Sequence, residues 1–312
     1  MAANEEDKMS WSTITLEKKE LSLADVLPTG QTFRWYKTRD DPEEWSGVIK
    51  GRVFILQQTE NELKYHVHSV KTTSSSNEED LLTLKEYFQL DTISLSKLYS
   101  DWSEVDETMR EVCHECPGVR ILGQDPLETL ISFICSSNNN ISRISLMINR
   151  LSRHFGASLG THRGTEFYSF PSVESLSRPG LEDKLRELGF GYRAKYVSGA
   201  VSYLSSQPSN WLESLQDLSY LEAWEALQII PGVGPKVSDC VCLMGLRKYE
   251  AVPVDVHMWR VSERLYGFKG AGKNLSIALY KEIGDMFRSR YGSYAGIAQA
   301  VLFRREISKG RK

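Results

Sequence analysis

The sequence predicts an α+β protein in which an N-terminal twisted antiparallel sheet packs on two mainly helical subdomains. The first hundred residues alternate between apolar and polar side chains and are rich in β-branched and aromatic residues, as half-buried strands are. Beyond about residue 111 apolar side chains recur with the period of a helix. A helix, a Gly-rich hairpin and a second helix follow between about residues 220 and 245, so the helical part contains a helix-hairpin-helix motif.

These patterns divide the chain into a sheet domain (1–112), a helical domain with the hairpin (113–135 and 220–312) and a second helical subdomain (136–219). Strands are expected within residues 11–17, 32–37, 44–58 and 63–70, and the polar, Ser-rich run 71–80 is expected to be a loop. Helices are expected at 81–88, 93–98, 106–113, 126–134, 141–154, 180–188, 194–205, 220–228, 275–287 and 294–303.

Composition limits the class of protein. The chain has 312 residues, 41% of them hydrophobic, which is enough for one large core or two to three small ones. Apolar runs of the ~20 residues that span a membrane are absent, and the first ten residues are acidic, unlike a leader peptide. Five cysteines, an odd number, favour reduced thiols. We expect a monomeric protein located in the nucleus; an additional mitochondrial location stays open.

The net charge of −3 is unevenly distributed between the two parts of the chain. Residues 1–112 carry 13 Lys and Arg against 22 Asp and Glu, whereas residues 113–312 carry 25 against 19. The excess of basic residues in the C-terminal part favours a polyanionic partner, although a solvated surface produces the same pattern.

The hairpin, Pro231-Gly232-Val233-Gly234, is suited to hold a phosphate. Glycine allows close approach of the backbone, and Pro235 at the first helical position loses no hydrogen bond. Exposed N–H groups at the start of the second helix form an anion site. By itself, such a hairpin is more often a plain phosphate grip than a catalytic element.

Lys236 and Asp255 are the candidate catalytic residues of this motif. Lys236 stands in the first helical turn, where the positive end of the helix dipole disfavours a charged ammonium, so it is a candidate amine nucleophile. Asp255 lies in VPVDVHMW, an expected extended run that can return a carboxylate to the start of the helix.

PGVGPKVSDC followed by VPVDVHMW resembles the helix-hairpin-helix-Gly/Pro-Asp motif of base-excision DNA glycosylases, and most closely the 8-oxoguanine DNA glycosylases. The resemblance extends from about Trp11 to Glu306. It implies an enzyme that excises 8-oxoguanine paired with cytosine in double-stranded DNA and has AP lyase activity. Lys236 would form the Schiff base, Asp255 would stabilise the developing cation, and His257 would support the site.

The same resemblance implies a pocket for the extruded base. Gly30, in LPTGQTFRW, would offer its carbonyl to the N7–H of 8-oxoguanine, a donor that guanine lacks. Gln299 would bind the Watson–Crick edge, and Phe303, four residues on and on the same helix face, would stack on the base. Cys240 would contact the other face of the base, and its position four residues after Lys236 suggests an ammonium–thiolate pair.

Two further runs match residues that contact the DNA left behind. Asn138 and Arg143, in ISFICSSNNNISRI, and Arg193, in LGFGYRAKY, would bind the orphaned cytosine. Tyr192 would fill the vacated stack, since unstacking a base costs a few kcal/mol. From the residues alone, both runs are ordinary helix corners.

The sequence suggests no required cofactor. Cys113 and Cys116 are not matched by a second cysteine pair at zinc-finger spacing, and the four-cysteine iron–sulfur loop of some related glycosylases is absent. The resemblance implies a cation (Ca²⁺, K⁺ or Mg²⁺) at the hairpin, bound by the backbone carbonyls of residues that match Gln228, Ile230 and Val233. The run Arg304-Arg305-Glu306 departs from the pattern of the family.

Two alternatives stay open at this point. One is a glycosylase for another lesion, which Gly30, Gln299 and Phe303 disfavour. The other is a non-catalytic DNA-binding protein that uses the hairpin only to hold phosphate, which Lys236 and Asp255 disfavour.

Overall fold

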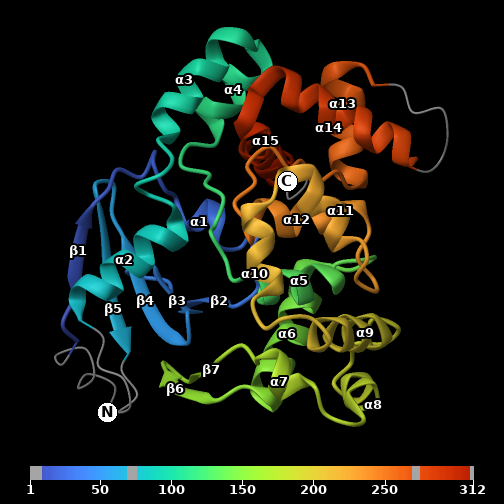
Figure 1. Cartoon of the computed structure of the whole chain (residues 1–312). Coiled ribbons are helices and arrows are strands. Elements are labelled where there is room, and N and C mark those ends of the chain that lie inside the picture. Colours follow the sequence, from blue (N-terminus) through green and yellow to red (C-terminus); the bar gives the residue numbers. More distant parts are fainter. Residues whose placement is uncertain (1–8, 69–75, 269–274, 310–312) are drawn as a thin grey trace.

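The computed structural model describes residues 9–68, 76–268 and 275–309. Its N-terminal part is a five-stranded antiparallel sheet with the order β1-β5-β4-β3-β2 (Figure 1). The strands are β1 (Ser12–Thr15), β2 (Trp35–Arg39), β3 (Glu44–Ile49), β4 (Arg52–Gln58) and β5 (Glu62–His68). The predicted N-terminal antiparallel sheet is therefore confirmed.

Both faces of the sheet are covered. Phe54 and Leu56 alternate along β4 toward a core that helix α2 (Asn77–Phe88) closes with Leu84 and Phe88. This alternation places every second side chain on one face. Val53, which precedes Phe54, faces the opposite side and packs with Phe167, in a segment far along the chain.

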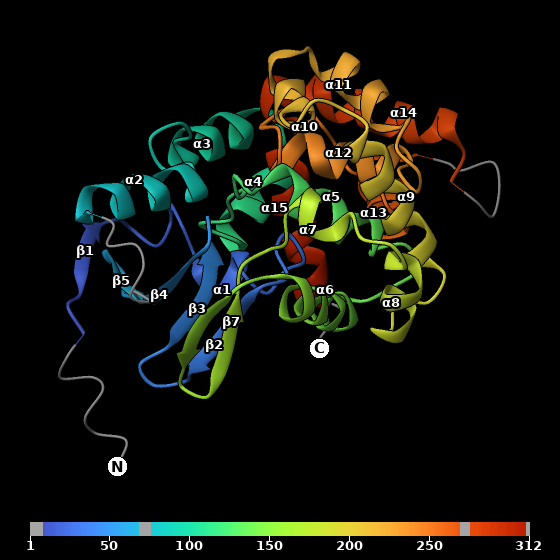
Figure 2. The ribbon, with the colours of Figure 1, turned by 60° about the horizontal axis from the view of Figure 1, so that its bottom comes forward.

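That segment is a hairpin of β6 (Ser158–His162) and β7 (Thr165–Tyr168), which lies against the sheet (Figure 2). The prediction that only helices follow residue 111 is wrong here. Arg163 and Gly164 take positive φ values of 46° and 78°, which form a tight strand-reversing turn. The side chains of His162 and Arg163 both bind the buried carboxylate of Glu44 on β3, at 2.9 and 2.8 Å.

The expected loop at 71–80 is also corrected in part. Residues 71–75 lie outside the described residues, but α2 begins at Asn77. Ser76 Oγ accepts a hydrogen bond from the N–H of Glu79, and the Glu79 carboxylate accepts one from the N–H of Ser76. This reciprocal capping box starts a helix within a polar, Ser-rich run.

The remaining elements are mostly helical. They are α1 (Leu23–Val26), α3 (Leu95–Val105), α4 (Glu107–Glu115), α5 (Pro126–Ile134), α6 (Ile141–Phe155), α7 (Val173–Leu176), α8 (Leu181–Glu187), α9 (Arg193–Ser205), α10 (Trp211–Ser214), α11 (Tyr220–Leu227), α12 (Pro235–Met244), α13 (Val256–Tyr266), α14 (Ile277–Tyr291) and α15 (Ala295–Lys309), with short 3₁₀ turns at Leu215–Asp217 and Gly292–Tyr294. The predicted helices are present, and α3 begins later and runs further than expected. The sequence prediction missed α13 and the short helices α1, α7 and α10.

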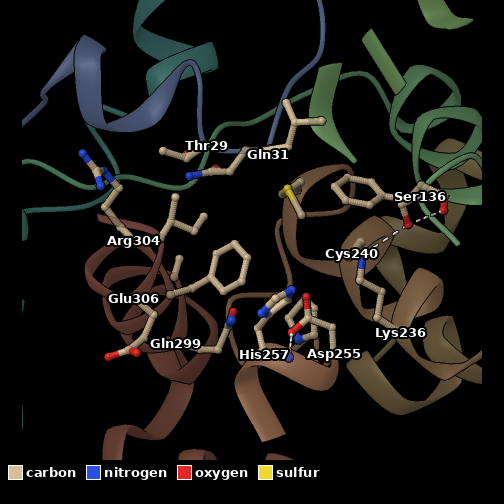
Figure 3. Close-up of a pocket in the computed structure, with 18 of the residues that line it drawn as sticks. Thr29, Gln31, Ser136, Lys236, Cys240, Asp255, His257, Gln299, Arg304 and Glu306 are labelled. Carbon is tan, nitrogen blue, oxygen red and sulfur yellow. Dashed lines mark hydrogen bonds between the residues drawn. The ribbon is translucent and has the colours of Figure 1, made fainter. Parts of the chain in front are cut away.

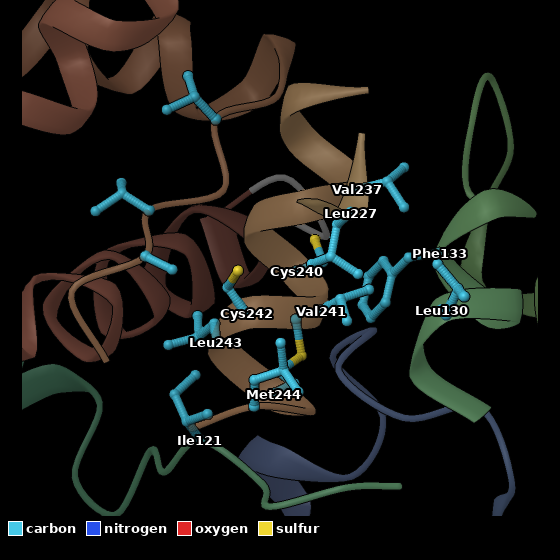
Figure 4. Close-up of a cluster of buried hydrophobic side chains, with 14 of the residues drawn as sticks. Ile121, Leu130, Phe133, Leu227, Val237, Cys240, Val241, Cys242, Leu243 and Met244 are labelled. Carbon is cyan, nitrogen blue, oxygen red and sulfur yellow. The ribbon is translucent and has the colours of Figure 1, made fainter. Parts of the chain in front are cut away.

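Helix α12 is at the centre of the helical core. Every side chain from Val237 to Met244 is buried, and Leu130 and Phe133 of α5 and Leu227 of α11 pack around it (Figure 4). A helix that is apolar almost all round must be enclosed by protein. The core therefore encloses α12 on most sides, and the helix reaches the cavity through Lys236 in its first turn and through one face further along that includes Cys240.

Helices α3 and α4 share this helical core through Trp102 and Met109, although their residues precede the proposed boundary at 112. The three-part division into 1–112, 113–135 with 220–312, and 136–219 stays a prediction. Among the described residues, none of the helices is both long and apolar enough to cross a bilayer.

Candidate active site

The helix-hairpin-helix consists of α11, a tight hairpin and α12. The hairpin turns at Gly232, whose φ of +84° is a left-handed conformation that suits glycine. A Cβ there would lie 2.5 Å from Cβ of Tyr196, so a larger residue has no room. Pro235 starts α12, and Gly234 before it provides no side-chain cap. The first N–H groups of α12 are therefore open to an anion.

Lys236 lies in the first turn of α12 and is half-buried. Its Nζ donates to Oγ of Ser136 at 3.3 Å and lies 4.7 Å from the centre of the Phe133 ring (Figure 3). It forms no ion pair with a carboxylate of the described residues. The amine is thus held in place by weak contacts, which leave its lone pair, once deprotonated, free to attack.

Asp255 is the N-cap of α13. Its Oδ1 accepts hydrogen bonds from the N–H groups of His257 and Met258, both at 2.9 Å. The expected extended run therefore ends at Val254, because the carboxylate starts a helix here. Oδ2 accepts no hydrogen bond from the described residues and is available to a substrate cation.

A cavity of about 650 Å³ lies between these elements. The predicted residues that line it are Gly30, Lys236, Cys240, Asp255, His257, Gln299 and Phe303. They come from the loop after α1, from α12, from the start of α13 and from α15, and the labelled side chains among them surround one space (Figure 3). An amine, a carboxylate, an amide and an aromatic ring at one cavity suit covalent chemistry on a flat polar group.

Gly30 occupies a narrow part of this wall. Its φ is +88°, and a Cβ there would lie 3.1 Å from Cδ1 of Ile141 on α6. The backbone conformation therefore favours glycine, and a side chain here would also crowd Ile141.

Cys240 is buried beside Lys236, but it does not form the suggested thiolate. Burial raises the pKa of its thiol to about 11, and the nearby Lys236 ammonium only partly opposes this effect. The thiol is therefore protonated at neutral pH, and the ammonium–thiolate interpretation is wrong for this conformation.

The residues predicted to contact the opposite strand lie outside this cavity. Arg193 is buried, and its guanidinium donates to the carbonyls of Ser137 and Asn138, the latter at 2.9 Å. The exposed ring of Tyr192 lies against the guanidinium at 4.5 Å, and its hydroxyl donates to the Ser137 carbonyl at 3.0 Å. Asn138 is exposed with a φ of 46°, and Arg143 is exposed in the first turn of α6. The two predicted runs thus meet at one surface.

Comparison with known proteins identifies the family. The sequence model described as 8-oxoguanine DNA glycosylase, N-terminal domain, matches residues 13–130, and that of the HhH-GPD superfamily of base excision DNA repair proteins matches residues 131–283. The N-glycosylase/DNA lyase OGG1 of Arabidopsis thaliana is 41% identical over 302 residues, which cover 95% of this chain and 80% of the relative. The chain belongs to the 8-oxoguanine DNA glycosylase family.

Further relatives and solved structures are also similar to this chain. The N-glycosylase/DNA lyase of Saccharomyces cerevisiae is 40% identical over 333 residues, covering 94% of this chain and 85% of the relative. The 8-oxoguanine glycosylase/lyase of Clostridium acetobutylicum in its apo form superimposes with a TM-score of 0.81 at 30% identity, covering 95% of this chain and 96% of that one. Its complex with DNA that contains cytosine opposite 8-oxoguanine gives a TM-score of 0.80, covering 93% of each chain. A 3-methyladenine DNA glycosylase of Archaeoglobus fulgidus, at 20% identity and a TM-score of 0.70, shares the fold.

Sequence reasoning missed several groups that line the cavity of this glycosylase. Ser136, the partner of Lys236, lies a hundred residues before it, so no local pattern connects them. Gln31 beside Gly30 and Arg304 beside Phe303 could have been included from their neighbours in sequence.

Proposed function

We propose that this chain is a bifunctional DNA N-glycosylase and AP lyase that extrudes and excises 8-oxoguanine paired with cytosine in duplex DNA. The observation that carries the proposal is that the amine of Lys236 and the carboxylate of Asp255 face one cavity, whose walls also carry Gly30, Gln299 and Phe303. The names of the relatives, N-glycosylase/DNA lyase, and the 8-oxoguanine·cytosine duplex in the Clostridium complex support it.

In the proposed reaction, the neutral amine of Lys236 forms a bond to C1′ of the damaged nucleoside. The C1′–N9 bond breaks, and the base leaves with the bonding electrons and takes up a proton. The bound amine then loses a proton, its lone pair forms the C1′=N bond as the C1′–O4′ bond breaks, and O4′ takes up a proton, which gives the Schiff base. The ionised Oδ2 of Asp255, which no described residue binds, stabilises the positive charge that develops on the sugar.

The lyase step uses the same Schiff base. The excised base, acting as a proton shuttle, takes a proton from C2′. The electrons of that C–H bond form the C2′–C3′ double bond, the C3′–O bond breaks and the 3′ phosphate leaves; hydrolysis of the remaining imine by water returns free Lys236. His257, which lines the cavity, supports the site and does not act as its base.

The base pocket distinguishes 8-oxoguanine from guanine. The carbonyl of Gly30 accepts from the N7–H of the oxidised base, whereas guanine presents a lone pair at N7. Two acceptors buried face to face cost roughly 1–3 kcal/mol, so the carbonyl disfavours the normal base. Gln299, which is 6% exposed and lines the cavity, binds the Watson–Crick edge of the base in this proposal, and Phe303 stacks on the base.

The surface formed by Asn138, Arg143, Tyr192 and Arg193 receives the orphaned cytosine. Tyr192 is exposed and so can enter the vacated stack. Arg193 donates to the carbonyls of residues 137 and 138 through Nε and Nη2, and none of these bonds uses Nη1, which is therefore the group that donates to cytosine.

The hairpin grips a phosphate through the backbone of Gly232, Val233 and Gly234. A Ca²⁺, K⁺ or Mg²⁺ ion bound by the carbonyls of Gln228, Ile230 and Val233 would add positive charge there. The residues fit such an ion, because the Ile230 carbonyl accepts one hydrogen bond, from the N–H of Val233 at 3.1 Å, and keeps a second lone pair. We further propose a monomeric enzyme located in the nucleus.

Borohydride trapping tests the proposal. Added during the reaction with an 8-oxoguanine·cytosine duplex, borohydride should reduce the Schiff base and trap a protein–DNA adduct. Lys236→Gln should abolish the adduct while preserving DNA binding. Duplexes that carry alkylated purines or oxidised pyrimidines, run in parallel, test the alternative of another lesion. An adduct formed by the Gln variant would show that Lys236 is not the nucleophile.

A further inference from the structure

Two separate parts of the chain form opposing walls of the base cavity. One wall is the loop between α1 and β2, which carries Gly30. The other is α15, which carries Gln299 and Phe303. In the proposed function the base contacts both the carbonyl of Gly30 and the ring of Phe303. The distance between the two walls must therefore stay constant.

The Gly30 loop is held in place next to Gly30, at the buried Gln31. The side-chain amide of Gln31 donates to the carbonyl of Arg120 at 2.8 Å and accepts from the N–H of Leu122 at 3.2 Å. Gln124 donates to the carbonyl of Gln31 at 2.8 Å. These bonds fix the loop to the segment before α5, but none of them reaches α15.

An ion pair joins α1, the helix directly before this loop, to α15. Arg304, directly after Phe303, donates through Nε and Nη2 to Oδ1 of Asp25 at 3.0 and 2.6 Å. Asp25 lies in α1, five residues before Gly30, and its Oδ2 accepts from the hydroxyl of Ser22 at 2.6 Å. The Arg304 side chain is 19% exposed and that of Asp25 28%, so water screens the pair only partly.

The position of Arg304 connects this pair to the substrate pocket. Arg304 lines the cavity and lies at the end away from Lys236 (Figure 3). It belongs to the Arg304-Arg305-Glu306 run, which the catalytic proposal does not use. The pair therefore joins α15 to the helix from which the Gly30 loop starts, and it does not touch the Lys236–Asp255 end.

We propose that the Asp25–Arg304 ion pair is a positioning device that sets the separation of the Gly30 loop and α15 and thereby aligns the base for excision. This inference rests on the proposed function. Excision needs the base held while C1′ is attacked, and a misplacement of about 1 Å can cost as much as 10²-fold in rate. Cleavage of a preformed abasic site uses Lys236 and the DNA surface but has no base to hold.

The test compares these two activities of the same protein. Asp25→Asn and Arg304→Gln should each lower the single-turnover rate of 8-oxoguanine excision about tenfold, with cleavage of an abasic-site duplex and DNA affinity changed less than twofold. The exchanged pair, Asp25→Arg with Arg304→Asp, should recover a large part of the excision rate. A general loss of structure would slow both activities together.

A matched control is the Arg52–Asp80 pair, which joins β4 to α2 away from the cavity and whose arginine is also 19% exposed. Asp80→Asn should leave the ratio of excision to abasic-site cleavage unchanged. Unaltered excision by Asp25→Asn and Arg304→Gln, or an equal loss of both activities, would overturn the positioning role. A wild-type protein that cleaves abasic sites but does not excise 8-oxoguanine would instead refute the proposed function, and the proposed positioning role with it.

Discussion

Asp255 has two roles that one substitution can separate. Its Oδ1 caps α13 through the N–H groups of His257 and Met258, whereas Oδ2 supplies charge to the cavity. Asparagine caps a helix about as well as aspartate, because its carbonyl oxygen can accept the same bonds, but it carries no charge. Asp255→Asn should therefore keep the fold and remove only the charge.

The expected loss of folding stability is much smaller than the expected loss of activity. For Asp255→Asn we expect a change of a few tenths of a kcal/mol in the free energy of unfolding, and a loss of about 10²-fold or more in excision. That loss corresponds to about 2.7 kcal/mol of transition-state stabilisation. Asp255→Ala removes the cap as well and should also cost about 1 kcal/mol of stability, or about 2 °C in Tm.

Thermal unfolding and single-turnover excision of 8-oxoguanine, measured on both variants, provide the assay. The Tm of the Asn variant should match that of the wild type, whereas its excision rate should be as low as that of the Ala variant. Excision by the Asn variant at the rate of the wild type would refute the reasoning and leave Asp255 as a helix cap alone.

Two further predictions concern other parts of the chain. Excision should be much faster opposite cytosine than opposite adenine, and Arg143→Ala should narrow this ratio, since each lost base-specific pairing costs roughly 1–3 kcal/mol; equal rates opposite the two bases in the wild type would exclude a recognition role for Arg143. At Glu44, burial raises the pKa, but bonds from His162 and Arg163 outweigh it and hold the pKa at about 2. Because this is below the ordinary value of 4.5, the stabilisation is complete above that pH and is lost as the pH falls toward 2. The stability gap between wild type and Glu44→Gln, from urea unfolding, should shrink from pH 6 to pH 3, and a constant gap would contradict the assignment.

The sequence by itself determined the local elements and the order of the chemical motifs. Period-two and helical patterns involve residues that are close in sequence, so the sheet and most helices could be predicted from them. Pro235 and the glycines before it indicated the hairpin. Local patterns failed where the deciding partner is distant. The β6–β7 hairpin is stabilised by Glu44 on β3, more than a hundred residues away, and its short strands carry little periodicity of their own.

Only the tertiary structure decided which of these groups face one another. The packing of α12 among α5 and α11 brings Lys236 to Ser136 and into the cavity with Asp255 and Gln299. The protonation of Cys240 likewise follows from burial, which the spacing of four residues from Lys236 does not reveal. Burial and contacts between distant segments depend on how the elements pack, and packing sums many weak interactions across the whole chain that no short stretch of sequence contains.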